Sequence, residues 1–208
     1  MARANAEYGK SVFINCPFDG DYSPMFEAVV FTIFDCGFQV RCALEIDDSG
    51  QIRIEKIFNV IAECRFGIHD LSRTELDGRN GLPRFNMPLE LGIFLGAKRY
   101  GARPQKQKVT LILDSEEYRY QAFISDIAGQ DVRAHDMEPL KAISVVRNWL
   151  RSASGDSTIP GGNVIGQRYG SFRRQLPVLK RALRLSKEDK LTFNDFTSVV
   201  SEWLKENS

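Results

Sequence analysis

The sequence predicts an α/β protein built on a parallel sheet with helices on both faces. Three observations lead to this fold class. Short runs that are almost continuously apolar alternate with longer stretches of helical periodicity. Polar or Gly- and Pro-containing turns separate the two kinds of segment. The chain of 208 residues is also long enough for one compact domain with a sizeable core.

Five segments have the pattern of strands buried in a parallel sheet, and four helices are expected between them. The predicted strands span 11–16, 38–44, 66–70, 109–114 and 131–135. The predicted helices span 24–36, 51–65, 88–100 and 116–127. The first helix is apolar nearly all round, which predicts burial on every side. In the third, Gly92 and Gly96 share one face, and we expect them to let that helix approach the sheet closely.

The rest of the chain has a helical pattern. Helices are predicted over 137–152, 171–185 and 192–205, the last with Thr192 as its N-cap. The stretch 154–170 is rich in Gly, Ser and Pro, and residues 159–165 within it are expected to be a turn or a lid. We therefore expect an α/β domain over 1–136 and a C-terminal helical extension over 137–208, packed on the same domain. This extension could cover the core, or it could form a partner or dimer interface.

Composition and charge exclude several classes of protein. Hydrophobic residues make up 43%, charged residues 26%, and the net charge is +1, so nothing favours direct binding of nucleic acid. No apolar run is long enough to span a membrane, and the N-terminus has no apolar signal core, so we expect a cytoplasmic protein without membrane contact. The cysteines lack metal-ligand spacing, so no metal site is expected. Cys16, Cys36 and Cys64 are predicted to be reduced core residues.

The stretch 84–92 is the most informative part of the sequence. It predicts a loop that delivers a carboxylate into the first turn of a helix. Pro88 suits the first helical position, and Glu90 follows where the helix dipole favours a negative charge. Arg84, Phe85 and Asn86 crowd the same approach. The alternative is that Glu90 merely caps its helix.

Several polar residues are expected at one edge of the sheet, because ligands of parallel sheets bind at the carboxyl ends of the strands. The first strand ends in the run 15–19 and the third in 70–73, and the helix of Glu90 starts at the same edge. The candidate catalytic residues are Glu90 and Asp70. The candidate substrate-binding residues are Asn15, Cys16, Pro17, Phe18, Asp19, Arg41, Ser72, Arg73, Arg84, Phe85 and Asn86. Asp70 as a loop cap, and Arg73 and Arg84 as solvated surface cations, are the structural alternatives.

This set of residues suits attack at the anomeric carbon of a nucleotide. A glycosidic bond breaks through an oxocarbenium-like state, which a close carboxylate stabilises or traps. Arginines bind phosphates, and aromatic rings stack a base. The sequence has no Gly-x-Gly-x-x-Gly or Walker A pattern, which removes most support for hydride transfer and for P-loop phosphoryl transfer.

Short motifs along residues 10–135 resemble one known group. They are Asp70-Leu71-Ser72, Glu90-Leu91-Gly92, Gly96-Ala97-Lys98 and the strand-and-loop run 13–18. Together they resemble the nucleoside 2-deoxyribosyltransferase-like group, which is related in fold to TIR domains. The resemblance implies a flavodoxin-like three-layer fold with a five-stranded sheet. It also implies a catalytic Glu90, an Asp70 that contacts the ribose or base, and a nucleotide pocket lined by residues 15–18.

The wider TIR clan contains enzymes that cleave the nicotinamide–ribose bond of NAD, and many bacterial members act in anti-phage defence. This chain differs from the transferases, because its first loop has Asn-Cys-Pro-Phe in place of a tyrosine-containing loop. Its Glu90 helix also follows Arg-Phe-Asn-Met-Pro in place of a Gly-Thr approach. The resemblance therefore implies the fold more directly than a deoxyribosyltransferase substrate.

Three hypotheses on function follow. The first is cleavage of an N-glycosidic bond, with NAD as substrate rather than cofactor. Nicotinamide leaves as a neutral molecule, so this reaction needs no general acid, and its product could be linear or cyclic. The second is base exchange or hydrolysis of a nucleoside, for which Asp70 is the candidate acid. The third is a non-catalytic module that senses a nucleotide or assembles with copies of itself or with a defence-system partner.

Overall fold

A five-stranded, all-parallel sheet forms the centre of the molecule, as the alternating sequence pattern predicts. We describe a computed structural model that covers residues 2–74, 76, 81–186 and 189–207, the side chains of 2–5 excepted. The strands are β1 (Ser11–Asn15), β2 (Gln39–Arg41), β3 (Phe66–Asp70), β4 (Val109–Asp114) and β5 (Val132–Ala134). Their order across the sheet is β2-β1-β3-β4-β5. This is the flavodoxin-like order, and its switch point lies between β1 and β3.

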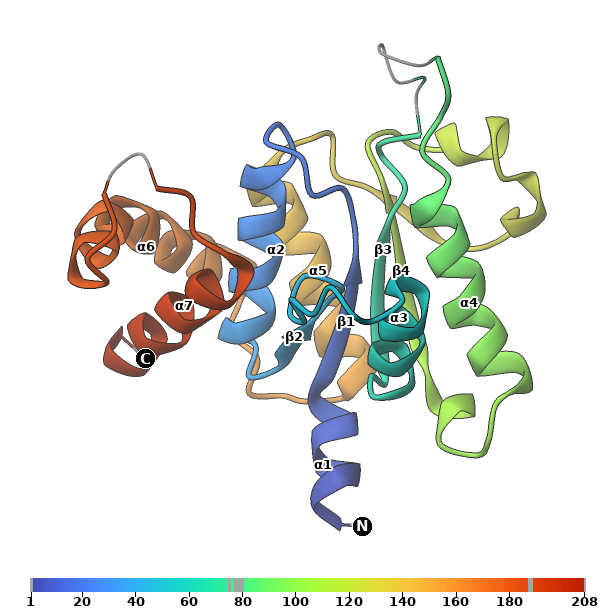
Figure 1. Cartoon of the computed structure of the whole chain (residues 1–208), viewed down its shortest axis with the longest axis horizontal. Helices are drawn as coiled ribbons and strands as arrows, with labels where there is room; N and C mark the ends of the chain where they lie inside the picture. The colour runs from blue at the N-terminus through green and yellow to red at the C-terminus, as the bar shows by residue number, and fades with distance from the viewer. Residues whose placement is uncertain (1, 75, 77–80, 187–188, 208) are drawn as a thin grey trace.

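Helices cover both faces of the sheet (Figure 1). One face carries α2 (Ser23–Asp35) and α5 (Pro139–Ser154), and the other carries α3 (Arg53–Ala62) and α4 (Asn86–Tyr100). Strand β1 shows why both faces need cover. Val12 and Ile14 belong to the core under α2 and α5, whereas Phe13 belongs to the core under α3 and α4. Successive side chains of a strand point to opposite faces, so a strand that is apolar throughout is buried on both.

The C-terminal helices α6 (Gly162–Ala182) and α7 (Phe193–Asn207) form a further layer outside α2 (Figure 1). The ring of Phe31 on α2 contacts three aromatic rings of this layer, with centroid distances between 5.3 and 5.8 Å. These rings are Tyr169, Phe172 and Trp203. Helix α2 is therefore enclosed between the sheet and the outer layer, which confirms the prediction from its all-round apolar pattern.

A capping box starts α7. The Oγ1 atom of Thr192 accepts the N–H of Asp195 at 3.1 Å, and the Asp195 carboxylate accepts the N–H of Thr192 at 3.0 Å. The prediction of Thr192 as N-cap is thus confirmed. Cys16, Cys36 and Cys64 are free and buried, as predicted, and Cys42 is free and buried as well.

The sequence-based helix over 116–127 is wrong. This stretch forms two 3-10 turns, η2 (Arg119–Ala122) and η3 (Ser125–Ile127). Tyr118 has a φ of 60°, and this left-handed conformation interrupts any α-helix that would run through it. A further 3-10 turn, η1 (Gln105–Gln107), leads into β4.

Other boundaries also differ from the sequence-based ones. Residues 159–165 are not a turn throughout, because α6 already begins at Gly162. Its glycines lower helix propensity, but burial of Ile165 and Tyr169 offsets that cost. Strands β2 and β5 and helix α3 are shorter than predicted. A helix that was not predicted, α1 (Ala2–Lys10), precedes β1.

The close approach of α4 to the sheet occurs at Gly67 of β3, and not at the glycines of α4. A Cβ atom built on Gly67 would lie 2.6 Å from Cζ of Phe94 and 2.9 Å from Nε2 of His69. A Cβ atom on Gly92 or Gly96 would meet nothing within 4 Å. The expectation for Gly92 and Gly96 is therefore wrong, and the contact depends on an aromatic ring that fills the space over Gly67.

Candidate functional site

Asn15 connects the end of β1 to the first turn of α4, beside the switch point of the sheet. Its Nδ2 atom donates to the carbonyl oxygen of Met87 at 2.8 Å and lies 3.0 Å from Nδ1 of His69. Burial, with a smaller effect of Lys108, lowers the pKa of His69 to about 3. The ring is therefore neutral, and its Nδ1 atom is the acceptor of the Asn15 amide. Asn15 is only 2% exposed and fixes the position of α4.

Glu90 lies in the second turn of α4 and is buried at the carboxyl edge of the sheet. The helix begins at Asn86, two residues before the start predicted from Pro88. The first turn of α4 contains no acidic residue, so Glu90 lies beyond it. The N-cap of α4 has no side-chain hydrogen bond, so Glu90 does not cap the helix. This start is allowed because the N–H that Pro88 lacks would have no intrahelical partner in the first turn.

The Glu90 side chain is a buried carboxylate without a compensating contact. The residue is 7% exposed, and within the described part of the chain its carboxylate forms no hydrogen bond or ion pair. Burial raises its pKa to about 7, and the positive charge of Arg53 at the start of α3 opposes this shift. A carboxyl group poised near neutral pH in a buried position is typical of functional sites.

Two thiols also indicate where Glu90 lies. Cys16 follows β1 and Cys42 follows β2, and burial is the main reason that both thiol pKa values are raised. The Glu90 charge adds to the shift in each case. Glu90 is therefore within electrostatic reach of the thiols that follow β1 and β2 and of Arg53 at the start of α3. Both thiols stay protonated at neutral pH, so neither is an activated nucleophile.

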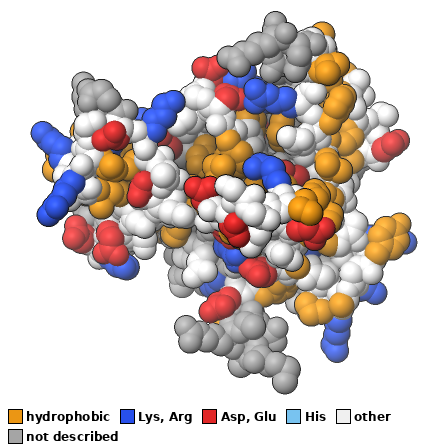
Figure 2. Space-filling model, in the orientation of Figure 1, with side chains coloured by type: hydrophobic (Ala, Val, Ile, Leu, Met, Phe, Trp, Pro, Cys, Tyr) orange, Lys and Arg blue, Asp and Glu red, His pale blue; other side chains and the backbone are white. Residues whose placement is uncertain are grey.

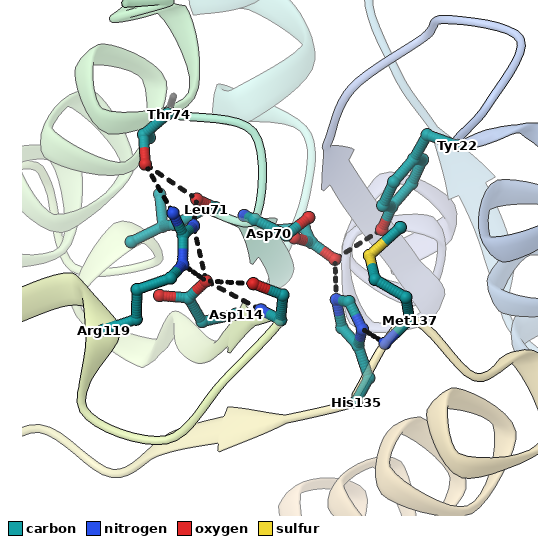
Figure 3. Close-up of polar contacts among 10 residues, drawn as sticks. Tyr22, Asp70, Leu71, Thr74, Asp114, Arg119, His135 and Met137 are labelled. Carbon is teal, nitrogen blue, oxygen red and sulfur yellow. Dashed lines mark hydrogen bonds and ion pairs between the residues drawn. The ribbon is translucent and has the colours of Figure 1, made fainter. Parts of the chain in front are cut away.

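Asp70, at the end of β3, is the centre of a closed hydrogen-bond network (Figure 3). Its Oδ2 atom accepts the O–H of Tyr22 and lies 2.9 Å from Nε2 of His135, while Oδ1 accepts the N–H of Ser72 at 2.9 Å. The N–H of Met137 donates to Nδ1 of His135, so the proton of a neutral His135 is on Nε2, directed at Asp70. Burial alone would raise the pKa of Asp70, but the bonds from His135, Ser72 and Tyr22 hold it below its usual value.

This network gives Asp70 a positioning role. The residue is fully buried, and its two oxygens accept bonds from the N-cap residue of α2, from the loop after β3 and from the segment after β5. A carboxylate with a lowered pKa is a poor proton donor at neutral pH. The geometry therefore does not favour the role of acid that the second hypothesis requires of Asp70.

A second buried carboxylate, Asp114 at the end of β4, anchors the neighbouring loop (Figure 3). Its Oδ1 atom accepts Nε of Arg119 at 2.8 Å. The same guanidinium donates to the carbonyl oxygen of Leu71 at 2.6 Å and to Oγ1 of Thr74 at 3.2 Å. Arg119 thus joins the segments that follow β3 and β4.

The arginines expected at the rim lie around Asp19. The guanidinium of Arg73 contacts Asp19 at 3.0 Å and Asp21 at 3.2 Å, and Arg84 lies 3.7 Å from Asp19. Asp19 also accepts the N–H of Tyr22 at 3.1 Å. The structure therefore brings Asp19, Arg73 and Arg84 together on the edge above β1 and β3, as the topology predicts.

The other candidate binding residues fall into two groups. Phe18, Phe85 and Asn86 are exposed, and Phe18 packs edge-to-face on Phe26 with a centroid distance of 5.5 Å. Cys16, Pro17 and Ser72 are buried. The exposed group is accessible to a ligand, whereas the buried group shapes the loops.

Arg41 is not brought to Glu90. Its guanidinium donates to Glu45 at 2.6 Å and to Glu63 at 2.8 Å, and Glu63 is the C-cap of α3, at the end opposite to Arg53. The bond to Glu45 is the largest reason that the pKa of Arg41 is raised further. Both contacts hold Arg41 away from the start of α3.

Two adjoining cavities open at this edge. One, of about 500 Å³, is lined by the loop after β2, by Arg53 and Lys56 of α3, and by residues 191–193 before α7. The other, of about 560 Å³, lies between residues 17–27 and the C-terminal helices. Leu44 and residues 191–193 line both. Figure 2 shows apolar side chains at the surface between the C-terminal helices and the middle of the molecule.

Sequence reasoning missed four residues of this region: Arg53, Tyr22, His135 and Arg119. Arg53 follows a polar loop at the start of a predicted helix, and this is the signal that could have identified it. His135 is the last residue of a predicted strand, but its pairing with Asp70 joins segments 65 residues apart. Periodicity cannot report such a pair.

No family model, no curated protein and no solved structure matches this chain. Within the described residues, no helix is both long and apolar enough to cross a membrane.

Proposed function

We propose that the protein cleaves an N-glycosidic bond of a nucleotide, with NAD as substrate and Glu90 as the catalytic residue. The observation that carries the proposal is the buried Glu90 carboxylate, which has no hydrogen bond or ion pair within the described residues. A group left in this state costs stability, and such a cost is typical of residues retained for chemistry. The cavity lined by Arg53 and Lys56 supplies space and positive charge for a phosphorylated ligand, and the charge of its Arg53 acts on Glu90.

The chemistry follows from the charges. The nicotinamide ring of NAD is cationic while it is attached to ribose. When the C1′–N bond breaks, its electron pair moves to the ring nitrogen and nicotinamide leaves as a neutral molecule. The positive charge that develops on the ribose is stabilised by an ionised Glu90, or is captured by one of its oxygens to form an ester. Water then forms a bond to C1′ and releases a proton to solvent, which gives the hydrolysed product; where an ester had formed, its C1′–O bond breaks and returns the electron pair to Glu90. Attack on C1′ by another group of the same nucleotide gives a cyclic product.

Product analysis tests the assignment. The purified protein is incubated with NAD, and nicotinamide is separated by chromatography. We expect nicotinamide from the unaltered protein and at least about a hundredfold less from Glu90→Gln, because the amide cannot neutralise the oxocarbenium charge. Glu206→Gln, at an exposed position on α7, is the matched control and should retain full activity. Turnover by Glu90→Gln at the normal rate would contradict the proposal.

Cleavage of an uncharged nucleoside is the second candidate, and the raised pKa of Glu90 favours it. A neutral base leaves more readily when it is protonated, and a carboxyl group with a pKa of about 7 can donate that proton. The two candidates differ in pH dependence. NAD cleavage requires ionised Glu90 and should rise with pH through about 7, whereas nucleoside cleavage requires protonated Glu90 and should fall over the same range.

Separate experiments test the non-catalytic alternative and the role of the protein in the cell. A shift in melting temperature with NAD, without any product, would favour a sensing module over an enzyme. For a cytoplasmic enzyme of anti-phage defence, infection should lower cellular NAD in bacteria that express the unaltered protein, but not in bacteria that express Glu90→Gln. An unchanged NAD level in both strains would argue against that role.

A further inference from the structure

The larger cavity, between the β1–α2 loop and the C-terminal helices, has the chemistry of a nucleotide-binding surface. Its lining includes the aromatic rings of Phe18, Phe26 and Phe193. Phe18 packs on Phe26 with a centroid distance of 5.5 Å, and Phe26 on Phe193 with 6.1 Å. Phe18 is 38% exposed, so one end of this aromatic row is open to a ligand. Such rings offer stacking surfaces to a planar base.

One exposed lysine of this cavity forms no polar contact within the described residues. Of its lining carboxylates, Glu27 contacts Arg173, Asp19 is bound by Arg73, and Asp189 accepts the N–H of Ser186. Lys190, in the same lining, has no hydrogen bond or ion pair within the described residues. An exposed cation beside an aromatic row suits a phosphate attached to a stacked nucleoside.

The segment that carries Lys190 leads into α7 and contacts the loop after β2. The Thr192–Asp195 capping box fixes its end, and the side-chain amide of Asn194 lies 3.4 Å from the carbonyl oxygen of Glu45 in the loop after β2. Residues 191–193 also line the cavity of Arg53. One segment of the C-terminal extension therefore borders both cavities.

We infer that the two cavities form one dinucleotide-binding cleft, in which Lys190 and the Phe18–Phe26–Phe193 row bind the half of the substrate that is not cleaved. This inference rests on the proposed function, because it places the scissile half in the cavity of Arg53, the residue whose charge acts on Glu90. It extends that function by naming a specificity determinant. The C-terminal helices make the protein select a dinucleotide over a mononucleotide.

The test compares NAD with nicotinamide mononucleotide, which has the same scissile bond and lacks the second nucleotide. We expect Lys190→Ala to raise KM for NAD about five- to tenfold, with kcat unchanged and with KM for the mononucleotide unchanged. Phe18→Ala, at an exposed ring, should act in the same direction. Lys205→Ala, an exposed lysine of α7, is the matched control and should leave both substrates unaffected.

Equal changes for the two substrates, or no change for either, would overturn the inference. Calorimetric binding of ADP to the whole chain separates this result from a failure of the proposed function. If the protein binds ADP and Lys190→Ala weakens that binding about fivefold, the cleft stands even when NAD is not cleaved. If NAD is cleaved and ADP binds equally to the unaltered protein and to Lys190→Ala, the cleft is refuted and the catalytic proposal stands.

Discussion

The side-chain amide of Asn15 donates to the main-chain carbonyl of Met87, and this contact holds the first turn of α4 against the end of β1. The same nitrogen serves His69, so both protons of the amide are directed at acceptors. Glu90 is one turn further along α4 and depends on this attachment for its position.

Replacing Asn15 with aspartate should therefore destabilise the fold. The substitution places a charged acceptor against the Met87 carbonyl and Nδ1 of the neutral His69, and it leaves both without a donor. We expect a loss of about 2–3 kcal/mol in the free energy of unfolding, measured in urea at pH 7. Asn163→Asp, at an exposed position near the start of α6, should change stability by less than about 0.5 kcal/mol. An equally small loss for Asn15→Asp would show that the amide does not fix α4.

Glu90 should make the protein less stable as the pH rises. Its pKa is about 7 in the fold against 4.5 for an exposed glutamate, so the folded state binds more protons than the unfolded state between these values. Stability from this group is complete below pH 4.5 and is lost as the pH approaches and passes 7.

Urea titrations at pH 5 and pH 8 measure this effect. We expect Glu90→Gln to be more stable than the unaltered protein at pH 8, with a gain about 2 kcal/mol larger than at pH 5. Identical pH dependence of the two proteins would mean that Glu90 ionises normally. In that case the carboxylate would not be held in a desolvated site.

For the Asp70 network, we predict a pH dependence of stability opposite in sign to that of Glu90. Tyr22→Phe removes one of the donors to a buried carboxylate and should cost about 1–2 kcal/mol at pH 7. The pKa of Asp70 is lowered in the fold, so the stabilisation exists above the ordinary aspartate value of 3.8 and is lost as the pH falls below it. The cost of Tyr22→Phe should therefore shrink on acidification. Tyr100→Phe, at a side chain that is 86% exposed, should be neutral at every pH.

The packing of α4 on β3 is tested at two glycines. Gly67→Ala would place a methyl group 2.6 Å from the Phe94 ring and should lower stability by about 1–3 kcal/mol. Gly92→Ala adds a methyl group to open space on an exposed helix position and should raise stability by about 0.5–1 kcal/mol. Thermal unfolding of both variants measures the contrast. Adding Phe94→Leu to Gly67→Ala should recover part of the loss, and no recovery would assign the loss to another cause.

The parts of the fold that are buried on both sides were the most predictable from sequence. The predicted bounds of β3 and β4 coincide with those of the structure. In β4 the reason is a nearly continuous apolar run between polar turns, which has few other interpretations. The stretch 116–127 was not predictable in this way. Its apolar residues have helical spacing, but the left-handed Tyr118 and the bonds of Arg119 to Leu71 and Thr74 depend on tertiary contacts.

The candidate site was predictable as a location but not as a set of contacts. Topology alone places the ends of β1 and β3 at one edge, and Asp19, Arg73 and Arg84 meet there. The burial of Glu90, its neighbour Arg53, and the pairing of Asp70 with His135 join segments that only the folded chain brings together. The role of Glu90 and Asp70 in catalysis stays a prediction until the variants are assayed.

The enclosure of α2 by the outer helical layer has a practical consequence for anyone trimming this chain. A fragment cut after β5 would lose the aromatic partners of Phe31 and would also lose α5, which covers one face of the sheet. The apolar surfaces of α2 and of that sheet face would then be exposed to solvent. Such faces cause aggregation, so a minimal soluble version must extend through Trp203.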